Sequence, residues 1–361
     1  MKEMVCCMGN EKTLVHGGDW AGYTAEFGTM PLDFSANVSP LGVPDGVSRA
    51  ITQAAAQSDR YPDPLCRELC ATIAHREEVP AEHILCGNGA TDLIFRAALA
   101  GKPKKALLTA PTFAEYESAL AAVCCDVVRY DLKEDQDFRL NEGFLRAITP
   151  DLDMVFLCEP NNPTGVTSPQ ALLLRIAEKC REKDVLLILD ECFADFLDDP
   201  EAHTLKRVLN EFPNLLILKA FTKLFGMAGV RLGYCLCADM SLLEAMRGAG
   251  QPWAVSSLAQ AAGIAALEER KYVEKLRRLI AAERPWLRQR LRALGLRVIP
   301  GEANYLLFAC DRPLTPPLRQ KGILVRGCAN YPGLDGRWYR VAVRTHEENE
   351  RLIAALTEVL S

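Results

Sequence analysis

Seven short apolar runs recur between residues 84 and 238, and helix-length stretches separate several of them. The runs are rich in Leu, Ile, Val and Cys, which is typical of strands buried on both faces. They are Ile84–Cys86, Ala106–Leu108, Val127–Tyr130, Met154–Leu157, Leu186–Leu189, Leu215–Leu218 and Leu232–Cys235. One intervening segment, Pro169–Lys183, has apolar residues at intervals of three and four, as in an amphipathic helix. The pattern predicts an α/β layered fold around a mainly parallel sheet.

The sequence after Pro252 is organised differently. A long helical, Arg-rich stretch extends to about Leu294. Three strand-like segments and a closing helix follow, at residues 297–308, 323–326 and 339–343 and from Glu347 onward. This order predicts a second, α+β domain. We therefore expect a large domain over residues 46–250 and a small C-terminal domain over residues 251–361.

Composition excludes several classes of protein. Of the 361 residues, 49% are hydrophobic and 25% are charged, with a net charge of −5, as in an ordinary two-domain globular protein. A general nucleic-acid surface is not expected, because binding a phosphate backbone requires a basic face. No apolar run has the length of a membrane span or a signal-peptide core, so we expect no membrane contact and a cytoplasmic location.

The fourteen cysteines, including the adjacent pairs Cys6–Cys7 and Cys124–Cys125, lack paired metal-site spacing, and we expect neither disulfides nor a metal.

One lysine is distinguished by its surroundings. Lys223 follows an apolar run, stands directly after Thr222, and precedes Arg231 by eight residues across a Gly-containing turn. A hydroxyl group and a guanidinium group at these positions can hold a phosphate beside the amine. Lys219 is the alternative, but no arginine follows it at the same spacing.

Two polar residues near the ends of other apolar runs extend this pattern. Asp190 ends an all-apolar run, where burying an unpaired carboxylate is unfavourable unless a cation compensates it. Asn162 lies in the rigid turn Glu159–Gly165. Pyridoxal phosphate requires a lysine for its aldehyde, an acid for its ring nitrogen and polar groups for its phosphate. The residues therefore predict this cofactor; a solvated strand end at Asp190 and an ordinary Asn-Pro turn are the alternatives.

On these residues the chain resembles the fold-type-I pyridoxal-phosphate enzymes of the class I/II aminotransferase group. Asn162–Gly165, Asp190–Glu191, Thr222–Lys223 and Arg231 occur in that family's order, and the likeness covers nearly the whole chain. The resemblance implies a three-layer sandwich with a mainly parallel sheet and a smaller α+β domain, which residues 1–45 join.

The resemblance also implies roles for single residues. Lys223 would bind the cofactor covalently and later move protons at the substrate's α-carbon. Asp190 would keep the ring nitrogen protonated, and Asn162 would donate to the cofactor's 3-oxygen. Thr222 and Arg231 would bind the phosphate.

Further cofactor contacts follow from the same resemblance. Gly89, Ala90 and Thr91 lie in a Gly-rich turn between a strand and a helix, where free N–H groups and the helix dipole favour an anion. Phe113 matches the aromatic residue that stacks on the cofactor, although a lone phenylalanine is usually a core residue. Tyr61 matches a tyrosine that completes the phosphate site of the neighbouring subunit, which implies a homodimer with shared active sites.

Two positions depart from the family pattern. Relatives often have Ser or Thr three residues before the lysine, where this chain has Ala220, so Thr222 and Arg231 should bind more of the phosphate. Many aminotransferases have a tyrosine three residues after the aspartate, where this chain has Phe193. Because phenylalanine has no hydroxyl group, Asn162 should be the main residue that tunes the cofactor's 3-oxygen.

The C-terminal strand-like segments carry three arginines. Arg326 ends the segment 323–326, Arg340 lies in the segment 339–343, and Arg344 directly follows that segment, four residues after Arg340. Period-two alternation would place Arg340 and Arg344 on one face of a strand. Arginine forms bidentate bonds with both carboxylate and phosphate, so the cluster suits a substrate that bears both groups. A solvated face of an edge strand is the alternative.

Motifs near both ends of the chain resemble one branch of the family, the threonine-phosphate decarboxylases of cobalamin biosynthesis. These motifs are His16–Asp19, Asp33–Gly42, Tyr61–Pro64 and Val325–Leu334. The histidinol-phosphate aminotransferases share the central motifs but match these less well. The resemblance implies that Arg340 binds the substrate carboxylate, that Arg326 and His16 approach the substrate phosphate, and that Asn37 contributes to the same site.

The sequence alone leaves open whether the protein catalyses decarboxylation or amino transfer. A decarboxylase directs the substrate carboxylate out of the cofactor plane, whereas an aminotransferase directs the α-hydrogen, and sequence does not specify this torsion. We expect first the decarboxylation of L-threonine O-3-phosphate to (R)-1-amino-2-propanol O-2-phosphate. Amino transfer on histidinol phosphate or an aromatic amino acid is second, and a non-catalytic pyridoxal-phosphate sensor is third.

Overall fold

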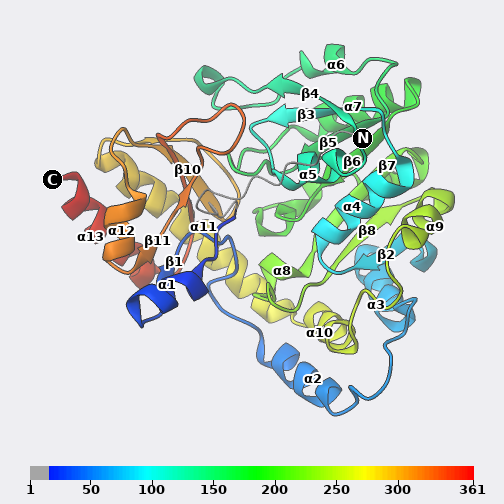
Figure 1. The fold of residues 1–361 in the computed structure, drawn as a ribbon, viewed down its shortest axis with the longest axis horizontal. Helices are drawn as coiled ribbons and strands as arrows, with labels where there is room; N and C mark the ends of the chain where they lie inside the picture. Colours follow the sequence, from blue (N-terminus) through cyan, green and yellow to red (C-terminus); the bar gives the residue numbers. More distant parts are fainter. Residues whose placement is uncertain (1–15) are drawn as a thin grey trace, which may run out of the picture.

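The structure is a computed structural model that describes residues 16–361, so Cys6 and Cys7 lie outside the described residues. A seven-stranded sheet forms the centre of the larger part (Figure 1). In spatial order its strands are β2 (Ile84–Gly87), β8 (Gly233–Cys237), β7 (Leu215–Ala220), β6 (Leu186–Asp190), β5 (Met154–Cys158), β3 (Lys105–Ala110) and β4 (Asp126–Asp131). All neighbours are parallel except β8, which is antiparallel to β2 and β7. The predicted α/β fold with a mainly parallel sheet is confirmed.

Six strands of the large sheet are buried on both faces, which explains why they read as apolar runs, whereas the edge strand β4 is exposed or half-buried along its length. In β7, Leu216 and Leu218 belong to one core cluster, while Leu215 and Ile217 belong to the other. The first face packs against α4 (Ala90–Gly101), α5 (Glu115–Ala121) and α9 (Met240–Gly248). The second packs against α3 (Arg67–Glu77), α7 (Gln170–Glu182) and α10 (Ser257–Leu267). Each fully buried leucine contributes about 1.5–3 kcal/mol to this three-layer arrangement.

A smaller part of the molecule is built on antiparallel strands (Figure 1). Their spatial order is β12 (Arg326–Gly327), β13 (Trp338–Ala342), β10 (Tyr305–Ala309) and β9 (Arg297–Val298). A separate parallel pair joins β1 (Leu32–Asp33) to β11 (Ile323–Leu324), so the N-terminal segment packs beside the C-terminal strands. The helices of this part are α1 (Trp20–Phe27), α11 (Arg270–Ala293), α12 (Thr315–Gln320) and α13 (His346–Leu360).

Two strand predictions for this part need correction. The segment 297–308 is not one strand, because a turn at Gly301 separates β9 from β10; a Cβ there would lie 2.7 Å from the carbonyl oxygen of Thr164. The segment 323–326 is divided between β11 and β12, which belong to different sheets. The long helical stretch is likewise two helices, α10 and α11.

Three further α-helices are α2 (Asp45–Ala55), α6 (Phe144–Ala147) and α8 (Phe221–Leu224), and short 3-10 helices lie in several of the connecting loops. Helix α2 packs against α10 at the edge of the larger part (Figure 1). No helix between residues 16 and 361 combines the length and apolar character that crossing a bilayer requires.

Candidate active site

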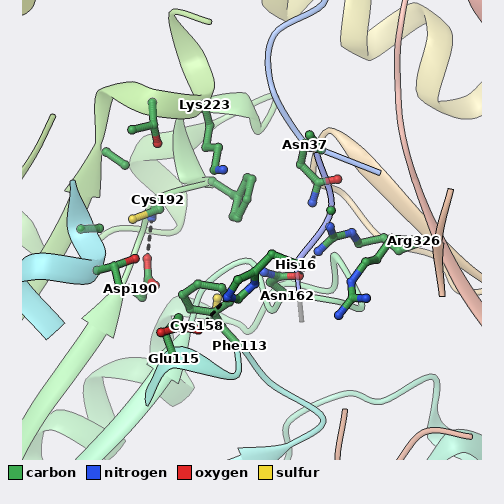
Figure 2. Close-up of a pocket in the computed structure, with 18 of the residues that line it drawn as sticks. His16, Asn37, Phe113, Glu115, Cys158, Asn162, Asp190, Cys192, Lys223 and Arg326 are labelled. Atoms are coloured by element: carbon green, nitrogen blue, oxygen red, sulfur yellow. Dashed lines mark hydrogen bonds and ion pairs between the residues drawn. The ribbon is translucent and has the colours of Figure 1, made fainter. Parts of the chain in front are cut away.

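A cavity of about 390 Å³ lies between the large sheet and the smaller part (Figure 2). Parallel strands end together at one edge of a sheet, and the loops that follow them usually carry the functional residues. Here the residues that follow β3, β5, β6 and β7 form one wall of the cavity. The N-terminal segment and the strands β12 and β13 form the other.

Lys223 lies on α8, directly after β7, and its side chain extends toward the cavity (Figure 2). Burial and then the nearby charge of Arg340 lower the pKa of its amine to about 8. An amine with this pKa is partly neutral at physiological pH and can act as a nucleophile. The backbone carbonyl of Lys223 accepts a hydrogen bond of 2.9 Å from the N–H of Ser39, so the N-terminal segment contacts this helix directly.

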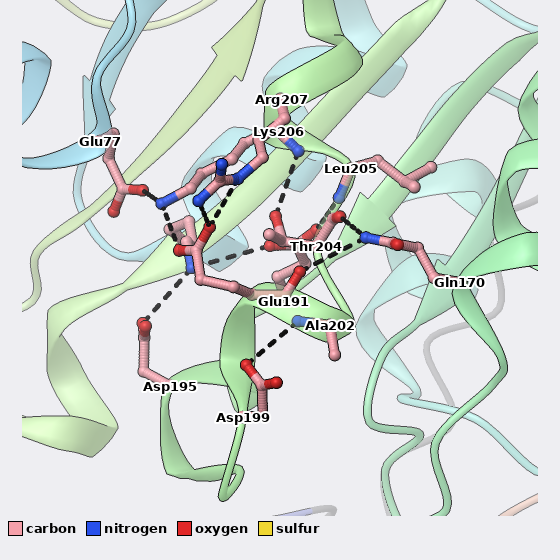
Figure 3. A network of polar contacts seen from close by, with 12 residues as sticks. Glu77, Gln170, Glu191, Asp195, Asp199, Ala202, Thr204, Leu205, Lys206 and Arg207 are labelled. Carbon is pink, nitrogen blue, oxygen red and sulfur yellow. Dashed lines mark hydrogen bonds and ion pairs between the residues drawn. The ribbon is translucent and has the colours of Figure 1, made fainter.

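Lys219, the alternative lysine, lies in a different environment. Its Nζ is 3.7 Å from Glu191 Oε2 and 3.5 Å from Asp195 Oδ2, within a buried network that extends to Glu77 and Lys206 (Figure 3). Burial disfavours the charged amine, but the three carboxylates outweigh burial and raise the pKa of Lys219. Lys219 is therefore a cation that joins the ends of β6 and β7, and it does not line the cavity.

Asp190 is the last residue of β6, and its buried carboxylate lines the cavity. The hydroxyl group of Tyr116 donates to Asp190 Oδ2 at 2.6 Å, and the N–H of Cys192 donates to Oδ1 at 3.0 Å. Burial and then the Asp190 charge raise the pKa of Tyr116, which keeps it a neutral donor. Burial followed by the same carboxylate raises the pKa of the Cys158 and Cys192 thiols, which also line the cavity.

Asn162 and Arg340 contact each other across the cavity. Arg340 Nη1 donates to Asn162 Oδ1 at 2.5 Å, and Nη2 donates to the carbonyl oxygen of Ser35 at 2.9 Å. Because its oxygen is the acceptor, Asn162 keeps its Nδ2 group as a donor. Within the described residues, Arg340 Nε and Asn37 Oδ1 are buried without a hydrogen-bond partner. Both residues line the cavity, so it holds polar atoms that a bound ligand could satisfy.

The turn before α4 and the segment after α8 form an anion-binding corner. Gly89 has a φ of 79°, and a Cβ there would lie 2.7 Å from Arg231 Nη2, so only glycine allows the guanidinium so close. Ala90 and Thr91, in the first turn of α4, line the cavity together with Thr222 and Arg231. The first turn of a helix offers free N–H groups to an anion. These residues fit a phosphate group.

The smaller part brings two further arginines to the cavity. Arg326 on β12 is directly opposite Arg340 on β13 in the antiparallel register, and both side chains are buried. Arg326 donates to Asn330 Oδ1 at 2.6 Å, and its guanidinium carbon lies 5.5 Å from the centre of the Tyr331 ring. Cationic side chains thus approach the cavity from both walls, as two anionic substrate groups would require.

His16 and Phe113 lie at the same cavity. His16 Nε2 is 2.7 Å from Glu115 Oε1, and the His16 ring is 6.0 Å from the Phe113 ring (Figure 2). Glu115, Tyr116 and Tyr331 were not among the residues predicted from the sequence. Glu115 and Tyr116 lie two and three residues after the predicted Phe113, but there they resemble ordinary residues at the start of a helix.

Two predicted residues lie elsewhere. Arg344 follows the end of β13, so the expected alternation does not reach it; it donates to the carbonyl of Asp33 at 3.1 Å and pairs with Glu348 at 2.8 Å. Arg344 therefore does not line the cavity. Tyr61 is 80% exposed and stacks on Trp253, with ring centres 4.6 Å apart, on the surface of the protomer.

Known proteins resemble the chain over most of its length. The profile of the family "Aminotransferase class I and II" matches residues 29–356. The threonine-phosphate decarboxylase of Salmonella typhimurium is 42% identical over 353 residues, with 96% of each chain covered. A histidinol-phosphate aminotransferase of Desulfitobacterium hafniense is 36% identical over 335 residues, covering 90% of this chain and 91% of that one.

Solved structures give the same result. The histidinol-phosphate aminotransferase of Clostridium acetobutylicum has a TM-score of 0.85 at 27% identity, covering 91% of this chain and 98% of its own. That of Sinorhizobium meliloti, in complex with pyridoxal-5'-phosphate, also has a TM-score of 0.85, at 25% identity, covering 96% and 95%.

Proposed function

The chain belongs to the aminotransferase class I and II family, and from this membership we propose that it decarboxylates L-threonine O-3-phosphate to (R)-1-amino-2-propanol O-2-phosphate, a reaction of cobalamin biosynthesis. The observation that carries the proposal is one cavity in which Lys223 faces two buried arginines, Arg326 and Arg340. The likeness to the Salmonella threonine-phosphate decarboxylase, which covers 96% of both chains, supports this substrate.

The cofactor is pyridoxal 5'-phosphate, and the residues at the cavity fit it. Arg231 lies against the glycine turn, where phosphate oxygens can meet the N–H groups of α4. Lys223 supplies the amine and Asp190 the carboxylate that the ring requires. When bound, the cofactor supplies a conjugated ring that delocalises the electron pair left by a broken bond at the α-carbon.

The protein's own groups have distinct tasks in this reaction. Lys223 Nζ, with its lowered pKa, can accept a proton and deliver it to the α-carbon after carbon dioxide leaves. Asp190 would hold a proton on the ring nitrogen, and the hydrogen bonds from Tyr116 and the Cys192 N–H keep its carboxylate oriented for this task. Phe113 lies where a ring could pack on the cofactor.

Substrate binding is proposed for the residues of the smaller part and the N-terminal segment. Arg340 would hold the carboxylate, and Arg326 with His16 would meet the phosphate. Asn37, whose buried Oδ1 lacks a partner in the described residues, would accept from the substrate or orient it. For Arg344 the position beside Asp33 and Glu348 supports a structural role instead.

A second activity, amino transfer on histidinol phosphate, is favoured by one specific observation. The histidinol-phosphate aminotransferase of Desulfitobacterium hafniense is 36% identical over 90% of this chain, so the same scaffold serves that reaction in a relative. Phe193, which lines the cavity three residues after Asp190, stands where many aminotransferases have a tyrosine, and this difference supports the decarboxylase as the first choice.

We further propose a cytoplasmic homodimer. The twelve cysteines among residues 16–361 are all free, as suits a reducing compartment. Tyr61 and Trp253 present two stacked, exposed aromatic rings, which suits a surface that a second copy covers.

Product analysis tests the proposal. Purified enzyme with threonine phosphate should release one carbon dioxide per substrate and need no keto-acid acceptor. Conversion of the cofactor to its amine form, reversed by 2-oxoglutarate and without carbon dioxide, would establish the aminotransferase instead.

A further inference from the structure

Glu115 is one of two acidic residues in a cavity that is also lined by four Lys or Arg side chains. It begins α5, and its carboxylate contacts His16 Nε2 at 2.7 Å (Figure 2). Lys223, Arg231 and Arg326 line the same cavity. The other carboxylate, Asp190, lies deeper and is bonded to Tyr116 and Cys192. Glu115 therefore has a different task from the cofactor's acid.

The N-terminal segment is held in place on its other side by the substrate arginine. Arg340 donates to the carbonyl oxygen of Ser35, and Ser35 Oγ accepts from the N–H of Gly18 at 2.8 Å. Gly17 packs so closely that a Cβ would overlap the carbonyl of Ser35. The backbone beside His16 is thus aligned with Arg340, while the imidazole is tied to α5 through Glu115.

We infer that Glu115 is a positioning residue that orients His16 as a hydrogen-bond donor to the substrate's phosphate, and thereby sets the preference for phosphorylated over unphosphorylated amino acids. The inference rests on the proposed function. A second carboxylate at this cavity would repel a phosphate if it stood alone. Because Glu115 is paired with His16, the imidazole ring would lie between the Glu115 carboxylate and the phosphate and would donate a hydrogen bond to the phosphate.

The chemistry of imidazole gives the pair its specificity. A neutral ring has one N–H group and one acceptor nitrogen, so it cannot donate to Glu115 and to a phosphate oxygen together. Donation to both at once requires an N–H group on each ring nitrogen, with Glu115 and the phosphate as the two acceptors. The imidazole would then donate to the phosphate beside Arg326, and this donor would add little for a substrate without phosphate.

A double-mutant cycle tests this inference. His16→Ala should raise the KM for threonine phosphate roughly 10- to 100-fold, as loss of a hydrogen bond to a charged group does. Glu115→Gln should raise it about 2- to 10-fold with kcat unchanged, and it should add nothing in the His16→Ala background. Both variants should leave the KM for threonine unchanged.

The matched control is Glu117→Gln on the same helix, because Glu117 pairs with the exposed Arg129 and does not line the cavity. It should leave both KM values as in the wild type. Multiplicative effects in the double variant, equal losses for threonine and threonine phosphate, or no effect of Glu115→Gln would each overturn the inference.

A separate readout distinguishes this inference from the proposed function. The change in cofactor absorbance on binding gives a Kd for threonine phosphate and for histidinol phosphate, whether or not carbon dioxide forms. If wild-type enzyme releases no carbon dioxide, the decarboxylase proposal fails. The double-mutant cycle of His16→Ala and Glu115→Gln is then measured on the Kd of whichever phosphorylated ligand binds. That result decides whether Glu115 acts through His16.

Discussion

At the scale of single residues, charge neighbours decide which buried lysine is reactive. Lys219 and Lys223 are four residues apart, and both amines are buried. Three carboxylates around Lys219 raise its pKa, whereas burial and two arginines near Lys223 lower its pKa to about 8. Only Lys223 can supply a neutral amine near physiological pH.

This difference predicts the pH dependence of cofactor binding to the apoenzyme. The neutral amine is the nucleophile, so the rate of covalent binding should rise with pH through a midpoint near 8 and not near the ordinary 10.5. Stopped-flow absorbance of added pyridoxal phosphate measures this rate. Lys223→Ala should abolish the covalent signal and the borohydride-reducible linkage, while Lys219→Met should retain both. A reducible linkage in Lys223→Ala would assign the role to another lysine.

The same pKa shift affects the stability of the apoenzyme. Between pH 8 and 10.5 the unfolded chain holds a proton at Lys223 that the folded chain has lost, so stability from this group rises with pH across that window. Denaturant unfolding of wild-type and Lys223→Ala apoenzyme at several pH values would measure it. Equal pH dependence in the two proteins would contradict the lowered pKa.

Asp190 gives a second residue-scale prediction. Asp190→Asn should keep the cofactor bound but slow turnover by roughly 10²-fold or more, because an amide cannot hold the ring's proton. Cys192→Ser is the control, since Cys192 contacts Asp190 through its backbone N–H, which serine retains. Single-turnover kinetics separates this step from binding. A loss of less than about tenfold would contradict the assignment.

The sequence predicted cavity residues that stand near strand ends or in motifs shared with relatives, and it missed Tyr116 and Glu115, which have neither signal. Lys223, Asp190 and Asn162 stand near the ends of apolar runs, where periodicity makes them visible. Tyr116 contacts Asp190 from 74 positions away, and Glu115 contacts His16 from 99 positions away. Such pairings depend on the packing of α5 against the sheet, which no local pattern encodes.

At the scale of elements, the register between β12 and β13 places Arg326 beside Arg340. Arg326→Ala should raise the KM for threonine phosphate by roughly 30-fold to several thousand-fold, because truncating one partner of a buried charge pair removes about 2–5 kcal/mol. Unphosphorylated threonine, a poor substrate, should be almost unaffected. Steady-state kinetics on both substrates measures the difference. Equal losses on both would mean that Arg326 does not recognise the phosphate.

The end of β13 provides the matched arginine control. Arg344→Ala removes the pair with Glu348, whose side chain also forms the capping box of α13 with Thr345. We expect a loss of about 1 kcal/mol in stability, seen as a lower melting temperature, with KM unchanged. A raised KM would return Arg344 to the substrate site.

Elements differ in how well the sequence predicted them. All seven strands of the large sheet were predicted: burial on both faces makes six of them apolar runs, and the exposed edge strand β4 was recognised by its β-type residues Val127, Val128 and Tyr130. The strands of the smaller part are short, and β11 and β12 are adjacent in sequence yet join different sheets. The pairing of β1 with β11, far apart in the chain, sets that division. Local pattern therefore predicted strand character there but not the strand partners.

At the scale of the whole molecule, the position of Tyr61 bears on assembly. Its ring is 80% exposed and stacked on Trp253, outside the protomer's own cavity. A side chain so placed can complete a phosphate site only in a second copy, and in a twofold dimer each copy would complete the other's site. The homodimer and the role of Tyr61 are thus a single proposal.

Mixing two inactive variants tests that proposal. A heterodimer of Lys223→Ala and Tyr61→Phe chains has one site with both substitutions and one site with neither. If both homodimers are severely impaired and the chains exchange freely, an equal mixture should recover about a quarter of wild-type activity, because half of the dimers have one native site in two. Lys223→Ala mixed with Asp190→Asn is the control, since both residues serve the same site in one protomer and no native site can form from one chain's Lys223 without that chain's Asp190. Activity in a strict monomer by ultracentrifugation, or no recovery despite proven chain exchange, would contradict the shared site.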